Sequence, residues 1–256
     1  MTIIANELRT TEEHLAEFPG MKAQSEVVLR RLERVRPLPA GSRVLDVGAA
    51  AGNFVLACRQ LGYVCEGVEP GANARAAAAA LGEHLRSPLE LAEGSAESIP
   101  FPDASFDLVH AASVIEHVID LDKAISEVYR VLKPGGVFWF NSASSMSPWQ
   151  GEIRGFPLFG WYPNSVKLKI MNWVKDAKPE LVGYSRTPAI HWFTPKKARR
   201  MLHRHGFERV FDRWDLRREE EGSAKYRLVL RLIRSSPPAR FLADVAVGGC
   251  SYAAVK

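Results

Sequence analysis

Apolar and polar residues follow two alternating patterns from residue 43 onward. Short runs rich in β-branched and aromatic residues give way to segments whose apolar residues recur at helical spacing. The short runs predict seven strands, and the segments between them predict helices. The expected strands cover 43–48, 63–70, 89–94, 105–113, 135–142, 207–216 and 250–256.

Helices are expected where the spacing changes. They cover 53–62, 72–82, 120–132 and 194–207, and the last has clear ends. Thr194 suits an N-cap, Pro195 suits the first helical position and Gly206 suits the C-terminal stop. Strands that alternate with helices predict an α/β fold, with a parallel sheet and helices on both of its faces.

Two regions depart from this alternation. Residues 1–40 are polar and helical, with one helix over 25–36 that Pro37 and Pro39 end, so they form an N-terminal helical cap. Residues 142–193 carry many aromatic residues, with an amphipathic helix over 164–176. Such an insertion after a sheet strand is often a lid or substrate pocket, although it can also be an excursion that packs on the domain. Segments 41–141 and 194–256 then form the core.

The stretch VLDVGAAAGNF, residues 44–54, is typical of a cofactor loop. Glycine lets the backbone approach a ligand closely, and the helix that follows presents free N–H groups. Gly48 and Gly52 keep the outer positions of a G-x-G-x-G pattern, but Ala50 stands in the middle. We expect the loop to hold Ala50 at a negative φ, which suits a residue with a Cβ.

Glu69 ends the second expected strand, 21 positions after Gly48. An acid at this place accepts hydrogen bonds from the ribose hydroxyls of an adenosine cofactor. The alternative is a surface Glu at a strand end. A dinucleotide dehydrogenase would share both the loop and the acid, so these two features leave the cofactor open.

Two further stretches, GSAESIPFPDASFDLVHAASVIEHV at 94–118 and VYRVLKPGGVFWF at 128–140, resemble the S-adenosylmethionine-dependent methyltransferases. The resemblance covers 43–141 closely and the C-terminal helix and strands loosely. It implies a Rossmann-like, mostly parallel sheet of seven strands with an antiparallel last strand, and S-adenosyl-L-methionine as cofactor. The likeness extends to the methyltransferase type 11 and ubiquinone-biosynthesis groups.

The resemblance also implies which residues bind the cofactor. In that family the glycine-rich loop holds the methionine part, the acid after the second strand binds ribose, and a segment before the fourth strand holds adenine. Ser95 stands where many relatives have Asp and would accept a weaker hydrogen bond. Carried over here, the residues are Asp46, Gly48, Ala50, Gly52, Glu69, Pro70, Ser95, Ala96, Glu97, Ala111 and Ala112.

Two histidines are candidate catalytic bases. His117 lies in SVIEHV, and His191 lies in PAIHWFTP at the end of the insertion. A structural role is open for both, at a helix start for His117 and in packing or capping for His191. SVIEHV resembles ubiquinone-biosynthesis O-methyltransferases, in which E-x-x-E-H has been linked to a metal. Here Ser113 replaces the first acid, and because Glu116 and His117 alone make a poor site we expect no metal.

Composition narrows the partners. The chain of 256 residues has a net charge of +5 and lacks an aromatic-basic motif, so we expect solvated basic helix faces and no nucleic acid.

Three cysteines without a CxxC pair suit reduced thiols in the cytoplasm. The first residues do not resemble a signal peptide, and no apolar run reaches 18 residues. Residues 225–234 predict either a packed helix or, less favoured, a peripheral membrane contact. The oligomeric state is left open.

The sequence therefore predicts methyl transfer to a small-molecule acceptor, chiefly a hydroxyl oxygen of an aromatic or apolar metabolite. Nitrogen and carbon acceptors are alternatives. A non-catalytic S-adenosylmethionine-binding module on the same fold is a second hypothesis, motivated by Ala50 and Ser95. A nicotinamide dehydrogenase fits less well, because LKPGG and the last strand do not belong to its pattern.

Overall fold

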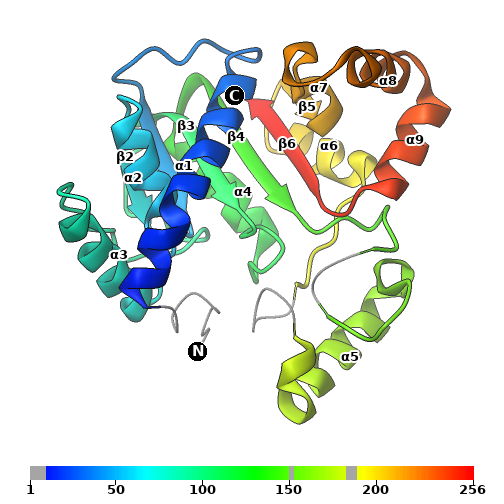
Figure 1. Cartoon of the computed structure of the whole chain (residues 1–256), viewed down its shortest axis with the longest axis horizontal. Helices are drawn as coiled ribbons and strands as arrows, with labels where there is room; N and C mark the ends of the chain where they lie inside the picture. The colour runs from blue at the N-terminus through cyan, green and yellow to red at the C-terminus, as the bar shows by residue number, and fades with distance from the viewer. Residues whose placement is uncertain (1–9, 150–152, 183–188) are drawn as a thin grey trace.

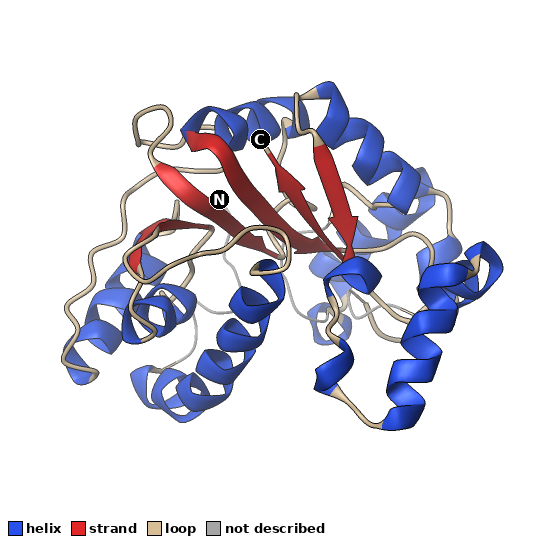
Figure 2. Cartoon of the chain, turned by 90° about the horizontal axis from the view of Figure 1, so that it is seen from above, coloured by secondary structure: helices blue, strands red, loops and turns tan. Residues whose placement is uncertain are grey.

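A six-stranded sheet forms the centre of the computed structural model, which describes residues 10–149, 153–182 and 189–256. Helices cover both faces of the sheet (Figure 2). The first four strands run parallel in the order β2-β1-β3-β4, and β6 lies antiparallel between β4 and β5. The strands are β1 Arg43–Val47, β2 Val64–Val68, β3 Phe106–Ala112, β4 Leu132–Ser142, β5 Arg209–Asp212 and β6 Cys250–Val255.

The expected strand over 89–94 is not one of them, so the prediction of seven strands is wrong for the described chain. Ala92 alone forms a parallel bridge with Val68 at the edge of the sheet. Its N–H donates to the carbonyl of Gly67, and its carbonyl accepts from the N–H of Glu69. The chain then turns back at Ser95, which bridges to Ser98, and this turn ends the pairing after one residue.

The expected strand over 207–216 is divided. β5 ends at Asp212, and helix α7, Arg213–Leu216, follows at once. The Asp212 side chain accepts hydrogen bonds from the N–H groups of Trp214 and Asp215, which is the capping that starts a helix. An apolar pattern alone does not distinguish a strand from a short capped helix.

Helices predicted between the strands are confirmed within a few residues. The N-terminal helix differs, because α1 covers Thr11–Leu32 instead of 25–36 and begins with a capping box between Thr10 and Glu13. Figure 1 shows α1 across the sheet beside α2. The other long helices are α2 Asn53–Gln60, α3 Ala72–His84, α4 Leu121–Val131, α5 Asn164–Ala177, α6 Pro195–Arg204, α8 Ala224–Ser235 and α9 Pro237–Ala246.

Alternating residues of the strands fill two apolar layers. Leu45, Val109 and Phe138 face one layer, which includes buried residues of α4 and α6. Val44 and Leu108 face the other, which includes buried residues of α1, α2 and α3. Strands buried on both faces explain their nearly continuous apolar sequences.

The aromatic insertion has a small core of its own. Phe159, Met171, Val174 and Trp192 are buried together, and Met171 and Val174 come from α5, which confirms the helix expected over 164–176. Figure 1 shows α5 apart from the sheet. The strand-like bridge of Ser144 with Phe193 brings the end of the insertion back beside β4.

The helix expected over 225–234 is present as α8, and the peripheral membrane contact stays a prediction. Leu230 and Ile233 are buried against Trp214 of α7, whereas Leu228 and Leu232 face solvent. Its contacts are with α7 and α9 rather than with the sheet face. No helix in the described ranges is long and apolar enough to cross a membrane.

Candidate cofactor and acceptor site

The glycine-rich loop joins β1 to α2 through three left-handed residues, Gly48 at φ 68°, Ala50 at φ 48° and Gly52 at φ 74°. The expectation of a negative φ at Ala50 is therefore wrong. The N–H groups of Gly48 and Ala49 donate to the carbonyl of Val68, so hydrogen bonds within the protein hold the loop in place. The Ala50 N–H donates to Glu69 Oε2 at 2.9 Å, and this bond needs the left-handed turn.

Both outer glycines are required by close packing as well as by φ. A Cβ on Gly48 would lie 2.5 Å from a methyl group of Val114, and one on Gly52 would lie 2.3 Å from a methyl group of Leu89. The loop thus passes directly under the segment that follows β3. Ala50 is the position of the three where a Cβ is accommodated.

Glu69 is fully buried at the end of β2. Its Oε2 accepts from Ala50, and its Oε1 accepts from the N–H of Gly71 at 2.9 Å. Glu69 and the neighbouring Pro70 lie beside the loop, as the sequence predicts, and Glu69 also fixes the loop's conformation.

Asp46 contacts a neighbouring strand. Its Oδ1 lies 2.6 Å from Nδ1 of His110 on β3, and both side chains are buried. The His110 ring is stacked between Phe54, at 3.6 Å between centroids, and Trp139, at 4.7 Å. This stack packs Asp46 and Phe54, the residues on either side of the loop, against β3 and β4, and the resemblance did not indicate it.

The turn expected to hold adenine is closed by two backbone hydrogen bonds between Ser95 and Ser98. Ala96 is buried, and Glu97 reaches across to accept the N–H of Ile119 at 2.8 Å. Glu97 therefore couples this turn to the segment between β3 and α4.

The end of β3 faces the same edge of the sheet. Ala111 is fully buried in the apolar layer, whereas Ala112 is exposed at the edge. Ser113 follows at φ 55°, and its N–H donates to Oδ1 of Asn141 on β4 at 2.6 Å. Ala112 and Ser113 therefore lie at the edge of the sheet where β3 ends.

A cavity of about 950 Å³ begins at this edge. Its walls come from α1, the ends of β3 and β4, and the loop that enters β6. Ser113, Glu116 and Asn141 line its end nearest the cofactor loop, and Trp139, Trp149 and Arg213 are also in its wall. A space of this size suits a small metabolite.

Glu116 is the buried acid of this cavity. It is 3% exposed, and the Ser142 hydroxyl donates to its Oε2 at 2.9 Å. Its backbone carbonyl accepts the N–H groups of Ile190 and His191, which ties the insertion to the site. The sequence had singled out the Glu116-His117 pair in SVIEHV as a candidate for the chemistry, with His117 rather than Glu116 as the base.

Neither candidate histidine is among the described residues that line the cavity. The His117 N–H donates to the carbonyl of Val114 at 2.9 Å. His191 Nε2 lies 3.0 Å from the carbonyl of Val118. Because a carbonyl only accepts, Nε2 carries the proton and Nδ1 keeps a lone pair in the neutral ring. Burial lowers the pKa of His191 and favours this neutral form.

Comparison with known proteins agrees with this geometry. Residues 45–140 match the family model of the methyltransferase domain. An uncharacterized methyltransferase of Bacillus subtilis is 38% identical over 100 residues, 39% of this chain and 40% of that protein. A sterol 24-C-methyltransferase of Aspergillus fumigatus is 32% identical over 173 residues, 60% of this chain and 45% of that protein. The chain thus spans less than half the length of these curated relatives.

Solved structures share the fold. A phosphoethanolamine N-methyltransferase of Haemonchus contortus in complex with S-adenosyl-L-methionine superposes with a TM-score of 0.57, 20% identity and coverage of 97% of this chain and 60% of that one. The cyclase SpnF gives a TM-score of 0.56 at 20% identity, with coverage of 92% and 81%. The matched domain holds the glycine-rich loop, Glu69 and the end of β3. The chain therefore carries a methyltransferase domain over residues 45–140, and its fold is that of solved S-adenosylmethionine-dependent methyltransferases.

Proposed function

We propose that the protein transfers the methyl group of S-adenosyl-L-methionine to a small-molecule acceptor held in the cavity. The acceptor atom we favour is a hydroxyl oxygen of an aromatic or apolar metabolite. The observation that carries this proposal is the cavity itself, because the buried acid Glu116 and Ser113 both line it next to the end of β3, where the sulfonium would lie.

The cofactor's place follows from the loop and its neighbours. The loop at Gly48–Gly52 would hold the methionine part, Glu69 and Pro70 the ribose, and the Ser95–Glu97 turn the adenine. Ala111 and Ala112 would border the sulfonium, with Asp46 acting through His110 as a positioning residue. Bound there, the cofactor supplies an electrophilic methyl group.

Transfer to a hydroxyl forms an O–C bond as the S–C bond breaks, and the electron pair of that bond stays on sulfur. The hydroxyl proton must leave to a base. The Glu116 carboxylate lines the cavity and is the first candidate. His191, through Nδ1, and His117 are the other candidates. The cavity would hold the acceptor in line with the methyl group, and such orientation can contribute about 7–11 kcal/mol.

A carbon acceptor is the second candidate function, favoured by the relatives, among them a sterol 24-C-methyltransferase. Product analysis separates the two, because an O-methyl and a C-methyl product differ in their NMR shifts. A binding module without methyl transfer is the third, and the cyclase that shares this fold shows that the fold alone does not fix the reaction.

Calorimetry with S-adenosylmethionine, followed by product analysis on a panel of phenols, tests the proposal. We expect Glu116→Gln to bind the cofactor normally and to lose about 10²–10⁴-fold in kcat, the usual contribution of a general base. Ser142→Ala, which removes only the partner of Glu116, serves as the milder control. A folded protein that does not bind the cofactor would overturn the proposed function.

A further inference from the structure

Arg213 lies in the cavity wall at the end opposite the cofactor loop. It is the first residue of α7 and directly follows Asp212, the last residue of β5. Strand register places Ala112, Asn141 and Ser251 in one row across β3, β4 and β6. Asp212 pairs with Tyr252, so Arg213 continues that row. Three strand spacings separate Arg213 from the end of β3, which is about 14 Å.

Within the described chain, no carboxylate forms an ion pair with the Arg213 guanidinium. Its Nη1 and Nη2 lie 3.5 and 3.4 Å from one acceptor, the carbonyl of Gly248. Burial lowers the pKa of this guanidinium below its ordinary value, although Asp244 acts in the opposite direction. An arginine has five N–H donors, so most of its hydrogen-bonding capacity is left for another group.

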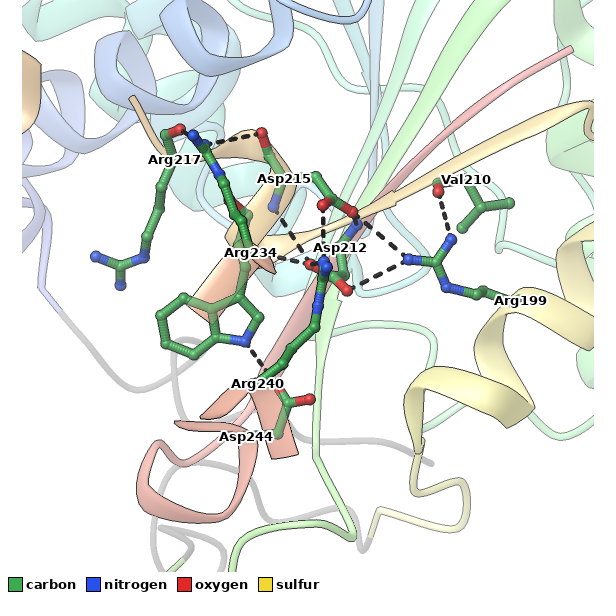
Figure 3. A network of polar contacts seen from close by, with 9 residues as sticks. Arg199, Val210, Asp212, Asp215, Arg217, Arg234, Arg240 and Asp244 are labelled. Carbon is green, nitrogen blue, oxygen red and sulfur yellow. Dashed lines mark hydrogen bonds and ion pairs between the residues drawn. The ribbon is translucent and has the colours of Figure 1, made fainter. Parts of the chain in front are cut away.

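The neighbouring acids are already engaged, as Figure 3 shows. Asp215 accepts from Arg240 at 2.7 Å and lies 3.5 Å from Arg199. Asp212 also contacts both of these arginines. Asp244 accepts the indole N–H of Trp214 at 2.7 Å. Arg213 therefore stands beside three carboxylates that bind other groups.

The other arginine of the cavity wall differs. Arg31 donates two hydrogen bonds to the Glu221 carboxylate, at 2.8 and 2.6 Å. Its charge is neutralised by that bidentate pair. Arg213 thus leaves the cavity positive at one end, and Glu116 makes it acidic at the other.

We infer that the acceptor carries an oxyanion, a carboxylate or a phosphate, that binds Arg213 while its hydroxyl lies near Ser113 and Glu116. A planar guanidinium binds two oxygens of such a group at once. The opposite charges orient the acceptor, because the oxyanion is attracted to Arg213 and repelled by Glu116. This inference rests on the proposed function, since it takes the cavity to be the acceptor site.

Binding of two matched probes tests the inference without any turnover. para-Hydroxycinnamate and its methyl ester share the ring and the hydroxyl and differ in charge. We measure their affinities by calorimetry on the full chain with S-adenosylhomocysteine present. The acid should bind wild type about ten- to a hundredfold more tightly than the ester, the usual effect of a hydrogen bond to a charged group.

Arg213→Gln should remove the preference for the acid and leave the affinity for S-adenosylhomocysteine unchanged. Arg213→Lys should keep part of the preference, and it retains the charge if the Gln variant does not fold. Arg209→Gln removes an exposed arginine of the preceding strand, β5, and should change neither affinity. Equal or undetectable binding of both probes by wild type, or an unchanged preference in Arg213→Gln, overturns the inference. Loss of S-adenosylhomocysteine binding instead contradicts the proposed function.

Discussion

Ala50 keeps a left-handed conformation between two glycines of the same sign of φ. The bond from its N–H to Glu69 holds it there, at a cost of about 1–2 kcal/mol for a residue with a Cβ. We predict that Ala50→Gly raises the free energy of unfolding by about 1 kcal/mol, because glycine adopts this conformation without strain. The greater entropy of the unfolded glycine-containing chain offsets part of this gain. Urea unfolding measures this change.

Ala51 provides the matched control for that substitution. It is buried and is not among the described non-glycine residues with positive φ. Ala51→Gly should therefore lower stability. Destabilisation by both substitutions would show that the Ala50 methyl group contributes more through packing than its backbone conformation costs.

The buried side chain of Lys167 leads to a second prediction at the scale of single residues. Its side chain is 1% exposed in the small core of the insertion, and its Nζ lies 4.4 Å from the centroid of the Trp192 ring. Burial lowers the pKa of Lys167 from 10.5 to about 8. Between these values the unfolded chain holds a proton that the folded chain does not, so stability from this group rises with pH. Below pH 8 the penalty is complete, at about 3 kcal/mol.

Lys167→Met should therefore stabilise the protein at pH 7, and its advantage over wild type should shrink as the pH rises from 8 toward 10.5. Urea unfolding of both proteins at pH 7 and pH 10 gives the difference in their free energies of unfolding at each pH. The other titrating groups are the same in both proteins, so their contributions cancel in this difference. An advantage that does not change with pH would mean that Lys167 keeps its ordinary pKa.

Single residues mark the limit of sequence-based prediction here. The loop, Glu69 and the Ser95–Glu97 turn are local motifs, so their positions followed from spacing and resemblance. The φ of Ala50 did not, because it depends on a carboxylate 19 positions away. Arg213 was passed over as part of an expected strand, since its significance lies in which carboxylates its neighbours already bind.

At the scale of elements, strands and helices in the core were predictable because each carries its own pattern. The segment 89–94 has a strand pattern, but Leu89 and Leu91 are buried beneath α2 and α3 while only Ala92 pairs with β2. Apolar alternation reports burial and does not report pairing. For the same reason, β5 and α7 were predicted as one strand. The side chain of Asp212 ends that strand by capping the helix.

The junction of β5, α7 and α9 depends on the charge network of Asp212. This acid is 5% exposed and contacts Arg199 and Arg240. Arg240→Ala would leave a buried carboxylate with one arginine fewer, and we predict a loss of about 2 kcal/mol, below the full cost of an unpaired charge. Chemical denaturation measures it.

Arg30→Ala is the control for this network. It removes a solvent-exposed pair with Glu26 on α1, so stability should hardly change. If Arg240→Ala has as little effect as Arg30→Ala, Arg199 alone is enough to compensate Asp212.

At the scale of the whole molecule, the cofactor side is formed by one continuous segment, whereas the acceptor side is formed by segments far apart in the sequence. Residues 45–140 form one continuous domain, and its local motifs identify the family. The cavity draws its walls from α1, from the ends of β3 and β4, and from the loop before β6. β3 and β4 pair directly, and the antiparallel pairing of β6 with β4 brings the loop before β6 beside them. The acceptor side therefore could not be read from any one stretch of sequence.

Filling the cavity from α1 should separate the two sides. Ala23 lies in the cavity wall on α1 and is exposed, so Ala23→Trp can place an indole there without disturbing the core. We predict that kcat/KM for the acceptor falls about tenfold or more, since displacement of about 1 Å already costs up to 10²-fold. Affinity for S-adenosylmethionine should stay within about twofold, because the change leaves the loop and Glu69 intact. Ala79→Trp, an exposed alanine of α3 away from the cavity wall, should alter neither quantity. Normal acceptor kinetics in Ala23→Trp would place the acceptor outside this cavity, and weakened cofactor binding would show that the two sides share space.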